Sequence, residues 1–271
     1  FMKVLIEKTG HKGGTYIEPF AGGAGIALDL LENDIVSQIV INDLDKGIYS
    51  FWRAILSETD RFVEAVHEVS VEEWKKQREI LLRADNKYSF ELGFSTFYLN
   101  RTNRSGIING GMIGGLEQNG VWKLDARFNK DNLINRILKI AKKKECIHLY
   151  NKDVASLIKN YLPKYEKEAF VYFDPPYFKK GKQLYLNFFN EQDHVRIEKM
   201  IRESVNCDWV ITYDDVPEIA NIYVNHELRR FDLNYSVAQK RKASEIIIFS
   251  NGDMIPDERY LEEHKVCINL R

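Results

Sequence analysis

The segment from Phe170 to Tyr177 constrains this chain more than any other, because an apolar run there leads directly into Asp174-Pro175-Pro176-Tyr177. The run is short, aromatic and β-branched, as expected for a buried strand. Neither proline can donate to a sheet ladder and each has a fixed backbone, so the strand ends in a stiff turn. The turn holds a carboxylate, a free carbonyl at Pro175 and a flat ring where open α/β sheets bind ligands. These groups suit a planar substrate with an amino group, such as a nucleobase taken out of a duplex.

A second ligand-binding signal lies near the start of the chain, where a strand, a glycine-rich turn and a helix follow one another. We expect the strand over residues 15–18, the turn over 19–25 and the start of the helix over 26–31. Glycines let a ligand approach the backbone closely, and a helix N-terminus carries a partial positive charge. This is the first unit of a nucleotide-binding fold. The turn does not match GxGxxG, which disfavours a nicotinamide-dependent dehydrogenase.

Two later aspartates also follow predicted strands. Asp43 ends the strand that begins at residue 38, about 20 positions after the glycine turn, where an acid can accept hydrogen bonds from ribose hydroxyls. The alternative is that Asp43 only caps the helix from Lys46 onward, and Asp45 is a less favoured ribose ligand. Asp153 follows a strand over residues 146–150, and on the residues alone it fits an N-cap of the helix 154–160 as well as a ligand contact.

The region between the two signals is mostly helical, except for a loop from Asn100 to Gly111 that is rich in arginine, asparagine and glycine. Arginine and asparagine suit base edges and phosphates, although a solvated loop is the alternative. The formal net charge is -1, so any nucleic-acid surface must be a local patch. Candidate DNA contacts, all basic or amide side chains, are Asn100, Arg101, Asn103, Arg104, Asn109, Lys123, Arg127, Lys180, Lys240 and Lys242.

Composition argues against several other classes of protein. The three cysteines are odd in number and far apart, and the six histidines show no ligand spacing, so we expect neither disulfides nor a metal site. The sequence has no apolar run long enough to span a membrane and no signal peptide, so we expect a cytoplasmic protein. The last stretch, from Asp253, looks like a surface tail.

The order of these features resembles Dam-type DNA adenine methylases, the alpha group of amino-methylating DNA methyltransferases, whose catalytic signature is Asp-Pro-Pro-Tyr. Phe20 and Gly22 fit the Phe-x-Gly-x-Gly motif of these enzymes, with Ala24 in place of the second glycine. An acidic second strand, an insertion with Asn-Arg, and a terminal β-hairpin over residues 226–234 and 245–250 complete the pattern. The resemblance covers nearly the whole chain.

The resemblance implies an α/β fold: a Rossmann-like S-adenosylmethionine-dependent methyltransferase sheet with a terminal β-hairpin and an inserted, mostly helical DNA-recognition domain. Residues 1–56 and 146–271 would form the catalytic domain and 57–145 the inserted target-recognition domain. The implied reaction moves a methyl group from S-adenosylmethionine to the 6-amino group of adenine in double-stranded DNA, by base flipping and direct transfer, without a metal.

The same resemblance assigns roles to two groups of residues. The implied catalytic residues are Asp174, Pro175, Pro176 and Tyr177. The implied cofactor-binding residues are Glu18, Pro19, Phe20, Ala21, Gly22, Gly23, Asp43, Asp153 and Asp174.

Several alternatives remain at this point. One is an amino-methylating enzyme acting on cytosine, which more often has serine in place of Asp174, or on RNA or a protein amide, which usually has asparagine there. Another is a DNA-binding relative that has kept the fold without turnover. Methylation at a cytosine ring carbon is rejected, because no cysteine here follows a proline. Family members also carry a segment of the Pro-Gly-Gly-Lys type, and none occurs before Glu18; since Met2 stands second, we expect the numbering to begin inside a longer natural chain or after a tag. A monomer is expected, and pairing with a restriction endonuclease is left open.

Overall fold

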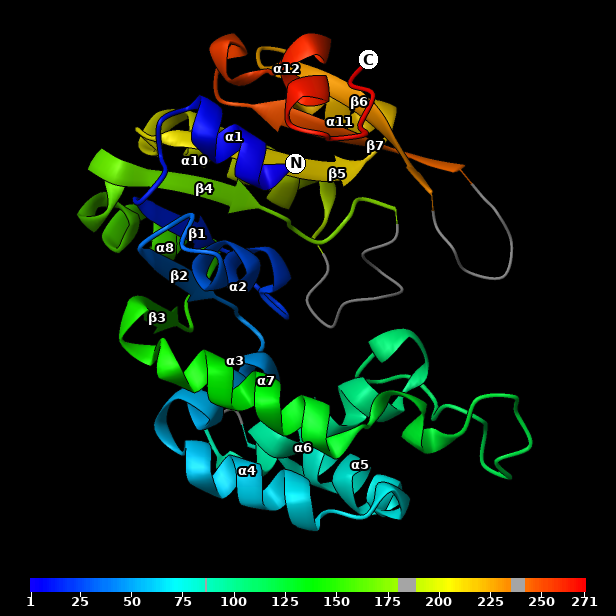
Figure 1. Cartoon of the computed structure of the whole chain (residues 1–271). Helices are drawn as coiled ribbons and strands as arrows, with labels where there is room; N and C mark the ends of the chain where they lie inside the picture. The colour runs from blue at the N-terminus through cyan, green and yellow to red at the C-terminus, as the bar shows by residue number, and fades with distance from the viewer. Residues whose placement is uncertain (86, 180–188, 235–241) are drawn as a thin grey trace. The chain divides into compact units, whose positions relative to one another are not determined.

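The structure is a computed structural model that describes residues 1–85, 87–179, 189–234 and 242–271. The chain forms two compact units, one of residues 1–42 and 152–271 and the other of residues 43–151 (Figure 1). The first unit contains the Asp-Pro-Pro-Tyr turn, and the second contains the expected insertion 57–145. Lys180 and Lys240 lie outside the described residues, as does the side chain of Lys242.

A seven-stranded, mostly parallel sheet is the scaffold, with the strand order β3-β2-β1-β4-β5-β7-β6 (Figure 1). The strands are β1 (Thr15–Glu18), β2 (Gln38–Asn42), β3 (Ile147–Tyr150), β4 (Ala169–Phe173), β5 (Asp208–Asp214), β6 (Glu227–Asn234) and β7 (Lys242–Phe249). Strands β2, β1, β4 and β5 pair in parallel, whereas β7 runs antiparallel to β5 and β6. The fold is therefore the expected Rossmann-like α/β sheet with a terminal hairpin.

The register of the central strands determines which residues meet at the edge of the sheet. The side chains of β1 are buried, as are most of those of β4 and β5, as is usual for parallel strands covered on both faces. Phe173, the last residue of β4, pairs with Ile211 of β5. The next residues on the two strands, Asp174 and Thr212, therefore lie side by side at the carboxyl end of the sheet.

Short amphipathic helices complete the first unit: α1 (Met2–Lys8), α2 (Gly25–Glu32), α8 (Val154–Asn160), α10 (Glu191–Ser204), α11 (Pro217–Ile222) and α12 (Glu258–Glu263). The best-capped is α10, where Asn190 and Asp193 form a capping box. Its residues Ile197 and Ile201 are buried. Among the described residues, no helix combines the length and apolar character needed to cross a membrane.

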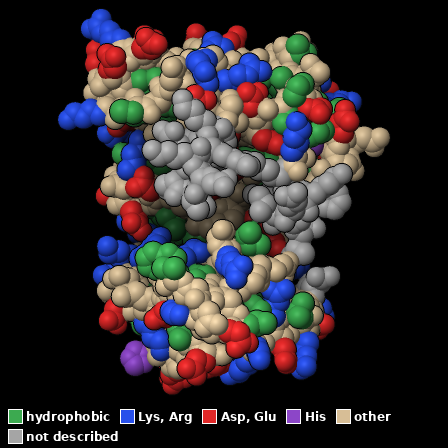
Figure 2. All heavy atoms as spheres, turned by 90° about the vertical axis from the view of Figure 1, so that its right-hand side faces the viewer, with side chains coloured by type: hydrophobic (Ala, Val, Ile, Leu, Met, Phe, Trp, Pro, Cys, Tyr) green, Lys and Arg blue, Asp and Glu red, His purple; other side chains and the backbone are tan. Residues whose placement is uncertain are grey.

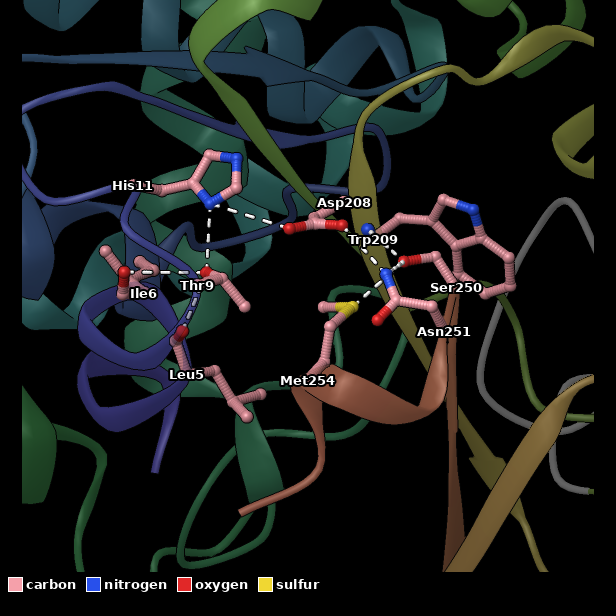
Figure 3. A network of polar contacts seen from close by, with 9 residues as sticks. All are labelled: Leu5, Ile6, Thr9, His11, Asp208, Trp209, Ser250, Asn251 and Met254. Carbon is pink, nitrogen blue, oxygen red and sulfur yellow. Dashed lines mark hydrogen bonds and ion pairs between the residues drawn. The ribbon is translucent and has the colours of Figure 1, made fainter.

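A polar network at the amino-terminal end of β5 ties α1 to the sheet (Figure 3). His11 Nδ1 lies 2.9 Å from Thr9 Oγ1, just after α1, and 3.8 Å from Asp208 Oδ2, at the start of β5. Asn251 Nδ2, just after β7, donates to Asp208 Oδ1 at 3.0 Å. These contacts lie at the opposite end of β5 from Thr212, so their role is to hold elements of the fold together.

The C-terminal stretch is not a surface tail, so that expectation was wrong. Met254 and Leu261 are buried, and Leu261 lies on α12. The backbone of Arg271 exchanges two hydrogen bonds, of 2.7 and 2.8 Å, with that of Arg230 on β6. The few apolar residues of this charged stretch are enough to dock it, and backbone pairing, which composition does not reveal, attaches its end to the hairpin.

The second unit is mostly helical and is built around a cluster of phenylalanines, in which Phe62 makes edge-to-face ring contacts. Its α-helices are α3 (Lys46–Ser57), α4 (Thr59–Glu68), α5 (Trp74–Arg83), α6 (Phe90–Thr102) and α7 (Lys130–Lys142). Gly93 lets α6 approach α3 closely, because a Cβ atom there would lie 2.4 Å from the carbonyl oxygen of Ser50. Phe62 is fully buried, with its ring centroid 5.3 to 6.1 Å from those of Phe51, Phe90, Phe94 and Phe97.

We expect Phe62→Ala to destabilise the second unit by about 3–5 kcal/mol, because it removes a buried ring and leaves a cavity among four others. Urea denaturation followed by circular dichroism measures this loss. Leu82→Ala is the matched control, because Leu82 is 69% exposed and its truncation leaves no cavity. Equal stability of the two variants would contradict a core centred on Phe62.

Candidate active site

Hydroxyl groups on strands β4 and β5 hold the Asp174 carboxylate in place. Thr212 Oγ1 donates to Asp174 Oδ1 at 3.1 Å. The hydroxyl of Tyr172, two residues before Asp174, lies 2.9 Å from the same Thr212 oxygen. Asp174 stays accessible to solvent, whereas Thr212 is buried. No contact among the described residues occupies the Pro175 carbonyl, so a carboxylate and a carbonyl remain available as acceptors.

Two further acids fix the rest of the turn. Asp214 ends β5, and its two carboxylate oxygens accept the backbone amides of Phe178 and Lys179, each at 2.9 Å. Glu245, buried on β7, accepts a 3.0 Å hydrogen bond from the Tyr177 hydroxyl. The aromatic ring of the turn is thus anchored at its hydroxyl end. Sequence reasoning missed both acids, and the only signal was that Asp214 ends the strand after the catalytic turn.

The surroundings of Asp174 change its acidity. The protein displaces much of the water around this carboxyl, which raises its pKa to about 6; the Thr212 hydrogen bond opposes the rise and the charge of Glu245 adds to it. Asp174 is therefore mainly ionised at neutral pH, yet binds a proton more readily than an ordinary aspartate. An acceptor of this strength suits a nitrogen that becomes positively charged.

Glu18 provides a second carboxyl at the end of the neighbouring strand, β1. It is 4% exposed, and its Oε1 accepts the backbone amide of Ala27, in the first turn of α2, at 3.0 Å. Burial raises the pKa of Glu18 to about 8; its hydrogen bond with Ala27 opposes the rise and the charge of Asp174 adds to it. Two carboxyls with raised pKa values favour a ligand that brings positive charge.

The glycine-rich turn after Glu18 leaves its backbone open to a ligand. Gly22 has a φ of +48°, and Ala24 a φ of +46°, so Ala24 adopts the left-handed conformation although it is not a glycine. No described atom beyond the chain neighbours lies within 4 Å of where a Cβ would stand on Gly22 or Gly23. This open space and the acids beside it fit a cationic nucleoside cofactor.

Asn42 connects the loops that surround this turn, and sequence reasoning missed it. Its side-chain amide is buried and donates to the carbonyls of Pro19, at 2.9 Å, and Lys152, at 3.0 Å. Its oxygen accepts the backbone amide of Lys152 at 2.9 Å. One asparagine at the end of β2 therefore positions both the glycine turn and the segment before Asp153.

Asp43 and Asp153, for which the sequence allowed either helix capping or a ligand contact, make different hydrogen bonds. Asp43 accepts the backbone amide of Asp45 at 2.9 Å, and Asp45, rather than Asp43, caps α3 through the amides of Gly47 and Ile48. Asp153 is exposed and caps α8, with its Oδ1 accepting the amide of Ser156 at 3.0 Å. Capping does not exclude a ligand contact by Asp153, so its cofactor role stays a prediction, as does that of Asp43.

Aromatic rings connect the glycine turn, the catalytic turn and α10. The ring of Phe20 lies 5.9 Å from that of Phe189, which lies 5.5 Å from His194. His194 also contacts Phe178 at 5.3 Å, and its Nδ1 lies 3.2 Å from the Tyr213 hydroxyl. Burial lowers the pKa of His194 to about 4, so the imidazole is neutral at physiological pH. Phe20 thus belongs to a packed ring cluster.

In the second unit, the loop after α6 is organised by its own side chains. Asn103 is fully buried; its oxygen accepts the Trp74 indole at 2.6 Å and its amide donates to the carbonyls of Ile107 and Ile108. The expectation that Asn103 contacts DNA directly is therefore wrong for this structure, because its side chain is inaccessible and fully used. Arg78, which sequence reasoning missed, donates to three carbonyls of residues 108–110.

The side chains of the other predicted DNA contacts in this unit differ in exposure and in the hydrogen bonds that they make within the protein. The amide of Asn100 donates to the Gly106 carbonyl at 2.9 Å, and the Lys123 amine donates to the Gln118 carbonyl. The guanidinium of Arg104 donates to the Met112 carbonyl at 3.3 Å, and its side chain is exposed. Asn109 is exposed.

Three arginines of the second unit gather without an acidic partner among the described residues. Arg101 is half-buried, and no described residue forms a hydrogen bond with its Nε. Burial lowers the pKa of Arg101, and the positive charges of Arg127 and Arg136 lower it further. The face shown in Figure 2 carries interspersed charges of both signs. Arg101, Arg127 and Arg136 form a local cluster of positive charge. Such a cluster suits an anion.

Comparison with known proteins identifies the family of the chain. The family model for D12 class N6 adenine-specific DNA methyltransferases matches residues 1–240. The Type II methyltransferase M.MjaIII of Methanocaldococcus jannaschii is 23% identical over 206 residues, covering 69% of this chain and 68% of that protein.

Two solved structures are distantly similar. The rRNA methyltransferase aviRa from Streptomyces viridochromogenes has 10% identity and a TM-score of 0.37, covering 93% of this chain and 84% of its own. A Legionella pneumophila protein has 11% identity and a TM-score of 0.36, covering 97% of this chain and 85% of its own. The family model, in contrast, spans most of the sequence, and the chain belongs to the D12 class of N6 adenine-specific DNA methyltransferases.

Proposed function

We propose that this chain binds S-adenosylmethionine at the carboxyl edge of its sheet and methylates the 6-amino nitrogen of an adenine that has been flipped out of double-stranded DNA. Adenine methylation in DNA is the activity of its family. The observation that carries the residue assignment is the turn after β4, where Thr212 holds Asp174 Oδ1 and Glu245 anchors the hydroxyl of Tyr177, while Asp174 Oδ2 and the Pro175 carbonyl have no hydrogen-bond partner among the described residues. Pro176 completes the stiff turn.

The acceptors of the turn act on the amino group of adenine. The lone pair of that nitrogen is delocalised into the ring, so the nitrogen is a poor nucleophile. Asp174 and the Pro175 carbonyl accept its two hydrogens, which favours a pyramidal nitrogen with an available lone pair. When bound, S-adenosylmethionine supplies an electrophilic methyl group and leaves as S-adenosylhomocysteine. Asp174 stabilises the positive charge that develops on nitrogen, and its raised pKa suits it to take up the proton.

The flipped base needs a surface to replace its stacking in the duplex. Tyr177 supplies a flat ring whose hydroxyl is fixed by Glu245, so the ring is ready before the base arrives. Extruding a base costs a few kcal/mol, which stacking and hydrogen bonds in the site offset. Transfer is direct, because the nitrogen itself attacks the methyl carbon and no covalent enzyme intermediate is required.

The cofactor residues are proposed from the open glycine turn and its acids. Gly22 and Gly23 leave room beside the backbone, and Pro19 is held by Asn42. Glu18 and Asp174 would face the positive charges of the methionine end. Ala21 and Phe20 shape the turn, while Asp43 and Asp153 would bind the ribose and the adenine ring.

The second unit is proposed to bind the DNA backbone through Arg101 and Arg127, with Arg136 as an addition that the structure suggests. Their charges lie close enough to lower the pKa of Arg101, and a phosphate would relieve that repulsion. We also propose that the enzyme acts as a cytoplasmic monomer. Pairing with a restriction endonuclease is proposed because the Methanocaldococcus relative is named a Type II methyltransferase.

We expect Asp174→Ala to lower the methylation rate by at least roughly 10²-fold, because it removes an acceptor aimed at the reacting nitrogen. The measurement uses labelled S-adenosylmethionine and unmethylated DNA, with mass spectrometry of the nucleosides. The wild type should yield labelled N6-methyladenosine. Asp253→Ala, at an exposed position of the same unit, is the control. Retained turnover in Asp174→Ala would show that Asp174 is not a catalytic residue. Methylcytosine as the product would show that the substrate base is cytosine rather than adenine.

Cofactor affinity should rise with pH between about 6 and 8. Below its folded pKa of about 8, Glu18 is mainly protonated and offers no negative charge to a cationic ligand, so binding must release a proton. Isothermal titration calorimetry in buffers of different ionisation enthalpy measures that release. Glu18→Gln keeps an oxygen for the Ala27 amide, and we expect it to weaken binding and flatten the pH dependence. An unchanged slope in this variant would rule out Glu18 as the titrating group.

We expect Arg101→Ala to weaken DNA binding and to reduce the slope of log affinity against log salt by about one, as loss of one phosphate contact does. Cofactor affinity should not change. Lys142→Ala is the matched control, because Lys142 is an exposed cation of the same unit, on α7. Equal salt slopes for Arg101→Ala and the wild type would take Arg101 out of the interface.

A further inference from the structure

The hydrogen bonds behind Asp174 have a direction. A threonine hydroxyl has one proton, and Thr212 donates it to Asp174 Oδ1 at 3.1 Å. The Tyr172 hydroxyl, 2.9 Å from Thr212 Oγ1, must then be the donor in that contact. The protons therefore point in sequence from Tyr172 to Thr212 and from Thr212 to the carboxylate.

We infer that Tyr172 and Thr212 are positioning residues for methyl transfer, forming a relay that orients the Asp174 carboxylate toward the amino group of the substrate. The relay occupies Oδ1 and so directs Oδ2 to the substrate. This inference rests on the proposed function, because it gives Asp174 the acceptor role. Neither residue touches the reacting atoms in this scheme, and both act through Asp174.

The sheet itself builds the relay. Tyr172 and Asp174 are two residues apart at the end of β4, so their side chains leave the same face. Thr212 of β5 is the neighbour of Asp174 in the parallel register that pairs Phe173 with Ile211. The long tyrosine side chain reaches Thr212 diagonally, as aromatic side chains in sheets can. Tyr172, Thr212 and Asp174 thus lie on the same face of the sheet, and the backbone pairing of β4 with β5 fixes their positions.

The protonation states keep the relay directed in the working pH range. Burial raises the pKa of Tyr172 well above its ordinary value, and the charge of Asp174 raises it further, so Tyr172 remains a donor. Among the described residues, the titratable groups whose pKa values are coupled to the charge of Asp174 are Tyr16 and Glu18 on β1, Tyr172 on β4, Tyr177 in the turn, Tyr213 on β5 and Glu245 on β7. The Thr212 hydrogen bond lowers the pKa of Asp174 against this acidic and apolar surrounding.

The test is the kinetics of Thr212→Val, which keeps the shape of the side chain and removes its hydroxyl. We expect kcat to fall roughly 10- to 100-fold, because a misdirected acceptor loses transition-state stabilisation. The acidic limb of the kcat–pH profile should move to higher pH, since Asp174 loses a bond that favours its ionised form. The KM values for cofactor and DNA should stay within about twofold. Thr212→Ser, which restores the hydroxyl, should recover both kcat and the profile.

A double-mutant cycle tests the order of the relay. Tyr172→Phe should lower kcat in the wild type, but should have no further effect in Thr212→Val, because the relay is already broken there. Tyr223→Phe is the control, because it removes a buried tyrosine hydroxyl of the same unit that does not belong to the relay. Circular dichroism and Tm establish that each variant is folded.

The outcomes separate the inference from the function on which it depends. If Asp174→Ala retains turnover, the acceptor role itself fails. If Asp174 is essential but Thr212→Val keeps the wild-type kcat and acidic limb, the relay inference alone is overturned. A lower Tm with unchanged kcat and pH profile per folded enzyme would show a structural role only, and would also overturn it.

Discussion

The parallel pairing of β4 with β5 is the constraint on which the rest of the site depends. It brings the residue after β4, Asp174, next to Thr212, and brings Asp214 within reach of the two amides that follow Tyr177. The antiparallel pairing of β7 with β5 then places Glu245 opposite Asp214, where it receives the Tyr177 hydroxyl. A one-residue slip in either register would turn these side chains to the opposite face and separate the turn from its supports.

The electrostatics of the site follow from the same crowding at the end of the sheet. Glu18 and Asp174 end adjacent strands, and the protein that surrounds them raises the pKa of both. Without a ligand, this arrangement favours a neutral Glu18, because burial disfavours its charged form and the nearby charge of Asp174 adds to that effect. A cationic cofactor would reverse that preference. We therefore propose that these acids select a ligand by its charge rather than stabilise the fold as ion pairs.

Local signals explain what could be predicted, and long-range contacts explain what could not. The Asp-Pro-Pro-Tyr turn, the strands beside it and the glycine turn are each encoded in fewer than ten consecutive residues. Glu245 escaped prediction because it meets Tyr177 across 68 positions of sequence. Asn103 was assigned to DNA because an amide looks the same whether it faces solvent or holds a loop, and only its contact with Trp74, 29 positions away, reveals the difference.

The division of roles between strands and turns has a physical reason. In the proposed function the cofactor needs room beside the backbone, and the turn at Gly22 and Gly23 leaves that room. The acceptor of the amino group, in contrast, has to be oriented before the base arrives, since correcting its angle during the reaction would raise the barrier. Tyr172 and Thr212 support Asp174 from two paired strands. The acceptor is thus oriented by the sheet, while the turns stay open for the ligands.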